Sequence, residues 1–170
     1  MKICVIRVIC VLNFKFPKII KMYQLSLPQF DFLYKKQDDA VLIFDVIRKK
    51  YVRLTPEEWV RQHVVQFLIQ HRNYPPALMN VEVSLKLYGL PKRADIVCYN
   101  SRGEAQLIVE CKAPTVAISH DTLTQIAHYN IVLKAPYLLV SNGLQHYMCE
   151  VNFDDKTFCV LREIPYFCQK

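Results

Sequence analysis

The sequence predicts an α/β (α+β) fold in which a mixed β-sheet is flanked by helices. Three observations predict it: a capped amphipathic helix that begins near residue 55, three successive strand-like segments within 81–112, and a second helix followed by a strand within 120–140. The order is therefore α-β-β-β-α-β, with extra strands at each end. A chain of 170 residues fits one domain and can bury a sizeable core.

The first helix has the clearest start signal. Thr55-Pro56-Glu57-Glu58 supplies an N-cap threonine, a proline at the first helical position and a glutamate at the third, which is the pattern of a capping box. The helix should run to about Gln70. Its apolar face consists of Val60, Val64, Phe67 and Leu68. Before it, we interpret residues 23–40 as an irregular arm and residues 41–54 as a hairpin.

Three strands follow this helix, and the last is the most apolar. Its Leu107-Ile108-Val109 run is apolar on both faces, as in a central strand, and Pro114 ends it. Turn residues separate the three at 89–92 and at 100–103. The expected elements are strands at 81–88, 93–99 and 105–112, a helix at 120–134, a strand at 137–140, and a final hairpin of strands at 146–151 and 157–161.

The chain divides into three parts. Residues 1–21 form an N-terminal extension, interpreted as artefactual or dispensable or, alternatively, as a weak membrane-surface tail. Residues 22–54 form the arm and hairpin, and residues 55–165 the main domain. The formal charge is +7, but residues 1–22 hold five of the 22 basic residues and no acid. The remaining 17 basic residues are nearly balanced by 15 acidic ones, which leaves a formal charge of +2. Any DNA contact must therefore come from a local basic patch.

Composition excludes several classes of protein. The chain has only three glycines, and they are far apart, so it contains neither a Walker A loop nor a dinucleotide-binding G-x-G-x-x-G motif. The seven cysteines are odd in number and include no C-x-x-C, so we interpret them as reduced core thiols of a cytoplasmic protein. The apolar run near the N-terminus is split by Arg7 and is too short to span a bilayer, so we expect no membrane partner.

One group of residues carries chemistry. Glu110 and Lys112 lie two apart on a strand and therefore point to the same face. Asp95 lies on the preceding strand, which a short turn joins, so Asp95 can sit beside Glu110. Two adjacent carboxylates raise each other's pKa unless a cation lies between them.

Mg²⁺ suits this arrangement, with Mn²⁺ as a substitute, because it prefers carboxylate oxygens and retains several waters. Asp95 and Glu110 would bind the ion, and the main-chain carbonyl of Cys111 is placed to add a third ligand. Lys112 could orient the attacking water or stabilise the charged transition state. Together these groups would hydrolyse a phosphodiester.

The alternative is structural, because Glu110 and Lys112 could form a simple same-face ion pair. Charges at the end of a buried strand are costly without a purpose, and this favours the functional interpretation.

The same residues resemble a known family. Residues 93–97 (Arg-Ala-Asp-Ile-Val) and 108–114 (Ile-Val-Glu-Cys-Lys-Ala-Pro) resemble the PD-(D/E)XK nuclease signature, with Ala94 in place of its proline. More narrowly, they resemble the N-terminal nuclease domain of type I restriction enzyme R subunits. Residues 125–129 match its Q-x-x-x-Y motif, and residues 141–143 resemble its Thr-Asn-Gly. The resemblance covers about residues 55–150 and implies a restriction-endonuclease-like sheet.

The resemblance also implies roles. Asp95 and Glu110 would bind metal, Lys112 would be catalytic, and Gln125 and Tyr129 would support the site or contact the DNA backbone. For Tyr129, packing on the sheet is the alternative. The implied partners are DNA and other restriction or defence subunits, or a second copy in a homodimer. We therefore expect a Mg²⁺-dependent DNA endonuclease, with an inactive nucleic-acid-binding module and a purely structural polar cluster as alternatives.

The remaining candidate residues for metal or DNA binding have weaker sequence support. Glu58 could add an acidic metal ligand, but the capping box explains it without metal. Lys86, Lys92 and Arg93 could line a DNA groove or form a solvated turn. We expect His128 at the surface.

Overall fold

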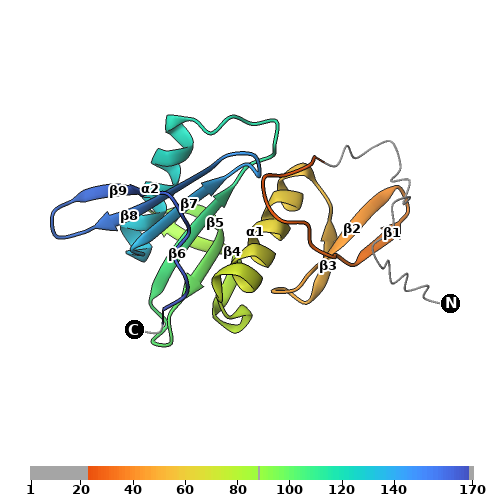
Figure 1. Ribbon diagram of the computed structural model, residues 1–170, viewed down its shortest axis with the longest axis horizontal. Coiled ribbons are helices and arrows are strands. Elements are labelled where there is room, and N and C mark those ends of the chain that lie inside the picture. Colours follow the sequence, from red (N-terminus) through yellow and green to blue (C-terminus); the bar gives the residue numbers. More distant parts are fainter. Residues whose placement is uncertain (1–22, 88, 169–170) are drawn as a thin grey trace.

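The computed structural model describes residues 23–87 and 89–168 (Figure 1), so the expected extension at residues 1–21 lies outside the described residues. Its elements are β1 (Tyr34–Gln37), β2 (Ala40–Asp45), β3 (Lys50–Arg53), α1 (Pro56–Arg72), a 3-10 turn η1 (Pro76–Leu78), β4 (Met79–Leu87), β5 (Leu90–Tyr99), β6 (Ala105–Cys111), α2 (His120–Leu133), β7 (Tyr137–Ser141), β8 (His146–Asn152) and β9 (Thr157–Leu161).

The first three strands form a small antiparallel sheet of their own, in the order β1-β2-β3. The expected hairpin at 41–54 is confirmed, but β1 lies within residues that we interpreted as irregular. The polar sequence Lys35-Lys36-Gln37 has no apolar alternation that would indicate a strand, because an edge strand can be solvated on both faces. Asp38, with φ 51°, makes the tight turn into β2.

The main sheet has six strands in the order β4-β5-β6-β7-β8-β9. Every neighbouring pair is antiparallel except β6 and β7, which are parallel and are connected through α2. The predicted order α-β-β-β-α-β is thus confirmed, as is the mixed α+β fold class.

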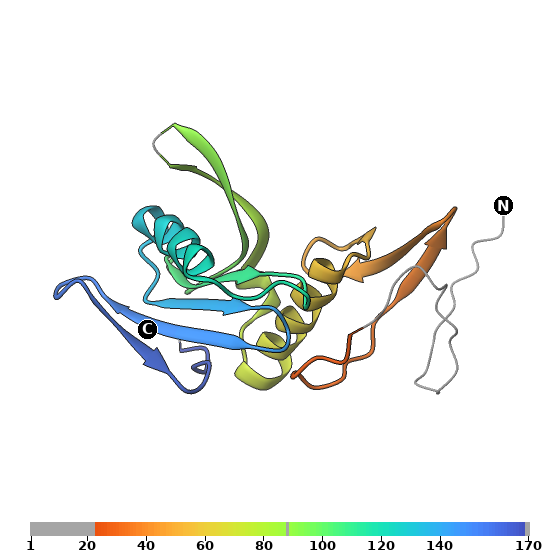
Figure 2. The same cartoon turned by 90° about the horizontal axis from the view of Figure 1, so that it is seen from above.

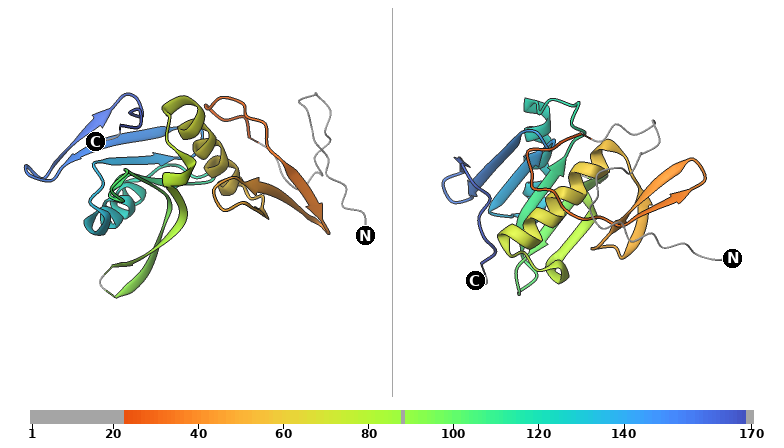
Figure 3. Two further views of the ribbon diagram at one scale, coloured as in Figure 1. Left: turned by 90° about the horizontal axis from the view of Figure 1, so that it is seen from below. Right: turned by 45° about the vertical axis from the view of Figure 1, so that its right-hand side comes forward.

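The two helices cover opposite faces of this sheet (Figures 2 and 3). On one face α1 contributes Val60, Val64 and Leu68 to a core with the inward side chains of β5 and β6. On the other face Ile126 and Tyr129 of α2 pack on Val97 and Ile108 of the same two strands. These central strands are therefore buried on both sides, as the apolar run at residues 107–109 predicts.

Both helices start and stop where local signals place them. The Thr55 hydroxyl accepts a hydrogen bond from the amide of Glu58, and the Ser119 hydroxyl accepts one from the amide of Thr122. Asn73 and Lys134 end the helices in the left-handed region, with φ 59° and 51°. α1 extends two residues beyond the predicted end at Gln70, because this cap lies at Asn73.

The β4–β5 hairpin extends well beyond the rest of the sheet and curves away past α2 (Figure 2). Its turn is tighter than the sequence indicates, since Leu87 pairs directly with Leu90 across Gly89 at φ 78° and Pro91 belongs to β5. Glu82, within β4, has φ 53° and leaves the ladder between the pairs of Val81 and Val83. A non-glycine residue in this region of a strand produces a local kink.

Among the described residues, no helix is long and apolar enough to cross a membrane. The five described cysteines are all free thiols, whereas Cys4 and Cys10 lie outside the described part.

Candidate functional site

Adjacent strands bring Asp95 and Glu110 to the same place. β5 and β6 pair with Ile96 opposite Val109, and the same register extended by one residue sets Asp95 opposite Glu110. Directly opposed residues share a face of the sheet, with their Cβ atoms about 5 Å apart. Lys112 follows β6 immediately and reaches back to the same carboxylate. The structure therefore brings together the three residues on which the sequence argument depends.

The hydrogen bonds of the two acids differ. An Asp95 Oδ2 atom accepts a hydrogen bond from the Cys111 amide at 2.7 Å, which ties this carboxylate to β6. Glu110 Oε1 accepts two hydrogen bonds, from Lys112 Nζ and from Gln125 Nε2, both at 2.7 Å. The second oxygen, Oε2, is buried and has no hydrogen-bond partner. A buried carboxylate oxygen without a partner is costly, and a bound cation or an ordered water would satisfy it.

The α2 helix supplies the remaining predicted residues. Gln125 and Tyr129 lie four apart, so both point from one helix face towards the sheet. Gln125 Nε2 also donates to the Tyr129 hydroxyl at 2.5 Å, and Tyr129 is buried in the core that α2 forms with the sheet. Tyr129 thus both packs on the sheet and, through Gln125, positions Glu110.

The electrostatics of the site favour an added cation. Burial, followed by the charge of Asp95, raises the pKa of Glu110 to about 7. Burial also raises the pKa of Asp95, although the Cys111 amide and nearby Arg61 and Lys112 oppose this. Burial acts to lower the pKa of Lys112, but its hydrogen bond to Glu110 and the neighbouring carboxylates raise it overall. Lys112 remains a cation, while the two acids repel each other.

These residues fit a hard divalent cation. Two carboxylates face each other, and one carries an oxygen atom with no partner. Within the described residues, no three His, Cys, Asp or Glu side chains come together as a ligand set, so further ligands would be main-chain oxygens or water. The Cys111 thiol does not qualify, because burial raises its pKa well above the usual value. The role of the Cys111 carbonyl stays a prediction.

Two residues of α1 border the site, and sequence reasoning missed both. Partial burial and then the charge of Asp95 raise the pKa of Glu57, which places Glu57 within electrostatic reach of the two acids. The charge of Arg61, one turn later, acts against the rise in the pKa of Asp95. Glu57 in a first helical turn is explained by the helix dipole alone, so the sequence offered no signal that this turn meets β5.

Glu58, by contrast, points into an ion network beside the site. Its carboxylate pairs with Arg61, accepts a hydrogen bond from Gln62 at 2.8 Å, and contacts Arg48 at 3.4 Å. The threonine half of the predicted capping box is present, but these contacts engage the glutamate side chain. The Glu58 side chain is therefore engaged by Arg61, Gln62 and Arg48 and does not form the reciprocal cap.

Glu82 forms ion pairs with three arginines, two of which also contact Glu58. It pairs with Arg48 at 2.6 Å and with Arg61 and Arg93 at 3.5 Å each. By the β4–β5 register, its kink lies opposite Asp95. The network therefore holds Arg61 and Arg93 near Asp95, where their charges oppose the rise in the Asp95 pKa that burial causes.

A polar hollow of about 440 Å³ adjoins the site between α2 and the β4–β5 hairpin. Lys92 lines it from the hairpin, and Gln125 and His128 line it from α2. His128 is exposed, as expected, although it borders this hollow. Lys92 gives the hollow a cationic group on the side of the hairpin, and Asp121 of α2 lines it as well.

The Ser141-Asn142-Gly143 segment has a structural role in this arrangement. Asn142 Oδ1 accepts hydrogen bonds from the amides of Leu144 and Gln145, and Asn142 Nδ2 donates to the Val116 carbonyl. It thereby ties the turn after β7 to the loop between Lys112 and α2.

Comparisons with known proteins bear on the family and the fold of this chain. A family described as the type I restriction enzyme R protein N terminus (HSDR_N) matches residues 56–165. A solved fragment of a protein assigned as an HsdR subunit of a type I restriction enzyme from Vibrio vulnificus YJ016 is similar in structure, with a TM-score of 0.50 and 18% identity. The match covers 66% of this chain and 24% of that one, so this chain spans about a quarter of the solved chain. No curated protein matches.

Proposed function

Because this chain belongs to the family of type I restriction enzyme R protein N termini, we propose that it is a divalent-metal-dependent endonuclease domain that hydrolyses phosphodiester bonds of DNA. The single observation that carries the proposal is that Asp95 lies beside Glu110, whose Oε2 atom is buried without a partner. Lys112 and Gln125 fix the other oxygen of that carboxylate.

Asp95 and Glu110 would hold the cation, for which we propose Mg²⁺, with Mn²⁺ as a substitute. When bound, such an ion lowers the pKa of a coordinated water and neutralises charge on a phosphate. Gln125, held by Tyr129, keeps the Glu110 carboxylate in one rotamer, so that its free oxygen stays aimed at the site. The Cys111 amide does the same for Asp95.

Lys112 is the catalytic cation of this proposal. Its raised pKa keeps it protonated at neutral pH, so it would place a positive charge beside the phosphate as negative charge develops there. Lys92 and Arg93 on the projecting hairpin would contact the DNA backbone, which requires cations but no base recognition. The proposed setting is restriction or defence, with other restriction subunits as partners.

The test is nicking of supercoiled plasmid with Mg²⁺ or Mn²⁺. The wild type is compared with Asp95→Ala, Glu110→Gln and Lys112→Ala, and Glu150→Gln and Lys50→Ala change exposed residues as matched controls. We expect the three site variants to lose at least about 100-fold in rate, and both controls to retain the wild-type rate. Nicking by the three site variants at the same rate as the wild type and the controls would contradict the proposal.

Titration calorimetry separates the alternatives. The proposed enzyme binds Mn²⁺, and Glu110→Gln weakens that binding. Salt-sensitive DNA binding without metal binding or cleavage would instead indicate a binding module of the same fold. Absence of both would leave Asp95, Glu110 and Lys112 as a structural polar cluster.

A further inference from the structure

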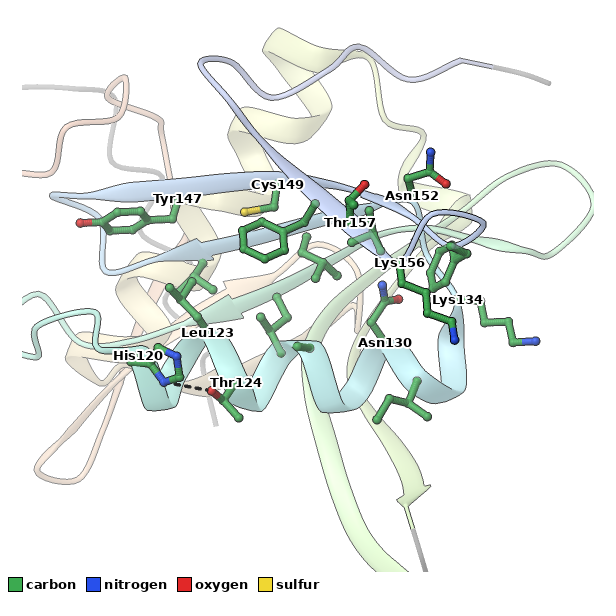
Figure 4. A pocket seen from close by; sticks show the side chains of 18 residues that line it. His120, Leu123, Thr124, Asn130, Lys134, Tyr147, Cys149, Asn152, Lys156 and Thr157 are labelled. Carbon is green, nitrogen blue, oxygen red and sulfur yellow. Dashed lines mark hydrogen bonds between the residues drawn. The ribbon is translucent and has the colours of Figure 1, made fainter.

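An apolar groove of about 610 Å³ lies between α2 and the β8–β9 hairpin, away from the site described above (Figure 4). One side of α2 lines it along the whole helix, from His120 through Leu123 to Lys134 at the C-cap. The opposite wall comes from Tyr147 and Cys149 of β8 and from the hairpin that follows.

The groove exists because α2 covers only part of its face of the sheet. α2 packs over β4 to β7, and no described helix lies over β8 and β9 on that side. Large apolar side chains are therefore left in solvent: Phe158 is 73% exposed, Val160 65% and Ile131 51%. A contiguous apolar surface of this kind on a folded domain marks an interaction site.

The charges of the groove are all of one sign and lie at one end. Lys134 and Lys156 line it near the C-terminus of α2 (Figure 4), and no carboxylate lines it anywhere. Within residues 23–87 and 89–168, neither lysine forms an ion pair. The nearby Asp155 accepts a hydrogen bond from Asn152 instead. The complementary partner therefore has an apolar body and carboxylates at one end.

We propose that this groove binds an amphipathic α-helix of a partner polypeptide, with carboxylates in its first turn facing Lys134 and Lys156. α2 has 14 residues and is thus about 21 Å long, so a helix of about four turns fills the groove. Such a helix would complete the layer of helices over the sheet. Acidic residues are most favourable in the first turn of a helix, so the incoming helix runs antiparallel to α2.

This inference does not depend on the nuclease proposal, since none of these residues belongs to the Asp95–Glu110 site. The probe is a fluorescein-labelled synthetic helix of about 15 residues, with leucines at positions i, i+3, i+4 and i+7 and glutamates in the first turn. A matched peptide carries lysines in that first turn. Fluorescence anisotropy measures their binding to the full chain.

The wild type should bind the acidic peptide at least about fivefold more tightly than the basic one at low salt. The double variant Lys134→Glu/Lys156→Glu should reverse this preference, whereas Lys49→Glu/Lys50→Glu, at two exposed positions where the turn meets β3, should leave it unchanged. Phe158→Asp should weaken binding of the acidic peptide by about tenfold or more. Because Phe158 is exposed, this variant should fold normally, and circular dichroism checks that it does.

Four results would overturn the proposal. One is equal affinity of the wild type for both peptides, and a second is binding that Phe158→Asp leaves unchanged. The third is a wild-type dimer in light scattering that Phe158→Asp converts to a monomer, because a second copy would then occupy the groove. The fourth is saturable binding of laurate together with no binding of either peptide, which would assign the groove to a small amphiphile.

Discussion

At the scale of single residues, Glu110 is a buried carboxyl group whose ionisation the fold opposes. Glu110 is 4% exposed, faces Asp95, and has one oxygen without a partner. Its pKa of about 7 in the folded chain lies above the ordinary 4.5. The folded state therefore holds this proton more tightly than the unfolded state, and stability falls as pH rises from about 4.5 through about 7.

Glu110→Gln removes this penalty. Without metal, we expect the free energy of unfolding of the wild type to fall relative to the variant by up to ~3 kcal/mol between pH 4.5 and pH 8. Added Mg²⁺ should stabilise the wild type at pH 8 and leave the variant unchanged. Urea denaturation across this pH range measures both effects. Parallel pH profiles of stability for the two proteins would show that folding does not raise the pKa of Glu110.

Asp45 is the opposite case, a buried acid whose charge is well compensated. Burial acts to raise its pKa, but hydrogen bonds and ion pairing with Arg48, together with the Ile47 amide, hold the pKa below its usual value. Its stabilising contribution is thus complete above about pH 4 and is lost as pH falls through the lowered pKa.

Asp45→Asn should cost about 1.5–3 kcal/mol of unfolding free energy at pH 7, because Arg48 loses one of the two carboxylates that lie 2.6 Å from it, and the Ile47 and Arg48 amides lose a charged acceptor. The difference from wild type should shrink below pH 4. Asp39→Asn, in the exposed β1–β2 turn, is the matched control and should be neutral. Chemical denaturation at the two pH values decides the matter, and an equal loss at both would refute the role assigned to the charge.

At the scale of elements, the kink in β4 is the feature that local sequence patterns do not explain. Val81, Val83 and Leu85 alternate as in a regular strand, yet Glu82 between them has φ 53°. Its carboxylate meets Arg48, Arg61 and Arg93. The ion network thus accompanies a backbone conformation that an isolated strand would avoid.

Two substitutions at Glu82 separate charge from backbone. Both Glu82→Asn and Glu82→Ile remove the ion pairs, but asparagine tolerates the left-handed region and a β-branched side chain does not. We expect the isoleucine variant to be less stable than the asparagine variant by roughly 1–2 kcal/mol, measured by thermal unfolding. Equal stability would mean that β4 straightens without cost.

At the scale of the whole molecule, the two sheets differ in how well they are buried. β5 to β7 lie between α1 and α2, whereas β1 to β3 form a small separate sheet with a cluster of a few buried side chains, including Phe32 and Ile43. Local opening depends on such differences in buried contacts.

Hydrogen exchange should therefore rank the elements. Amides of β5, β6 and β7 should exchange only with global unfolding, while those of β1 to β3 and of the edge strand β9 should exchange at least about 100-fold faster. Mass spectrometry on pepsin fragments of the intact chain measures this. Equal protection in β1 to β3 and in β6 would show that the chain opens as one cooperative unit.

The sequence by itself determined the helices, the central strands and the residues of the candidate site. It did so because caps, apolar periodicity and turn residues act over a few positions, and because Asp95, Glu110 and Lys112 lie on consecutive strands joined by one short turn. β1 escaped prediction, since a polar edge strand has no apolar alternation.

Only the tertiary structure decided which groups surround those residues. That Glu57 and Arg61 of α1 approach Asp95, that Gln125 binds Glu110, and that Glu82 kinks β4 all depend on contacts between elements far apart in the chain. The groove over β8 and β9 likewise follows from where α2 lies across the sheet. Such contacts depend on how whole surfaces pack, and no local pattern of residues encodes that packing.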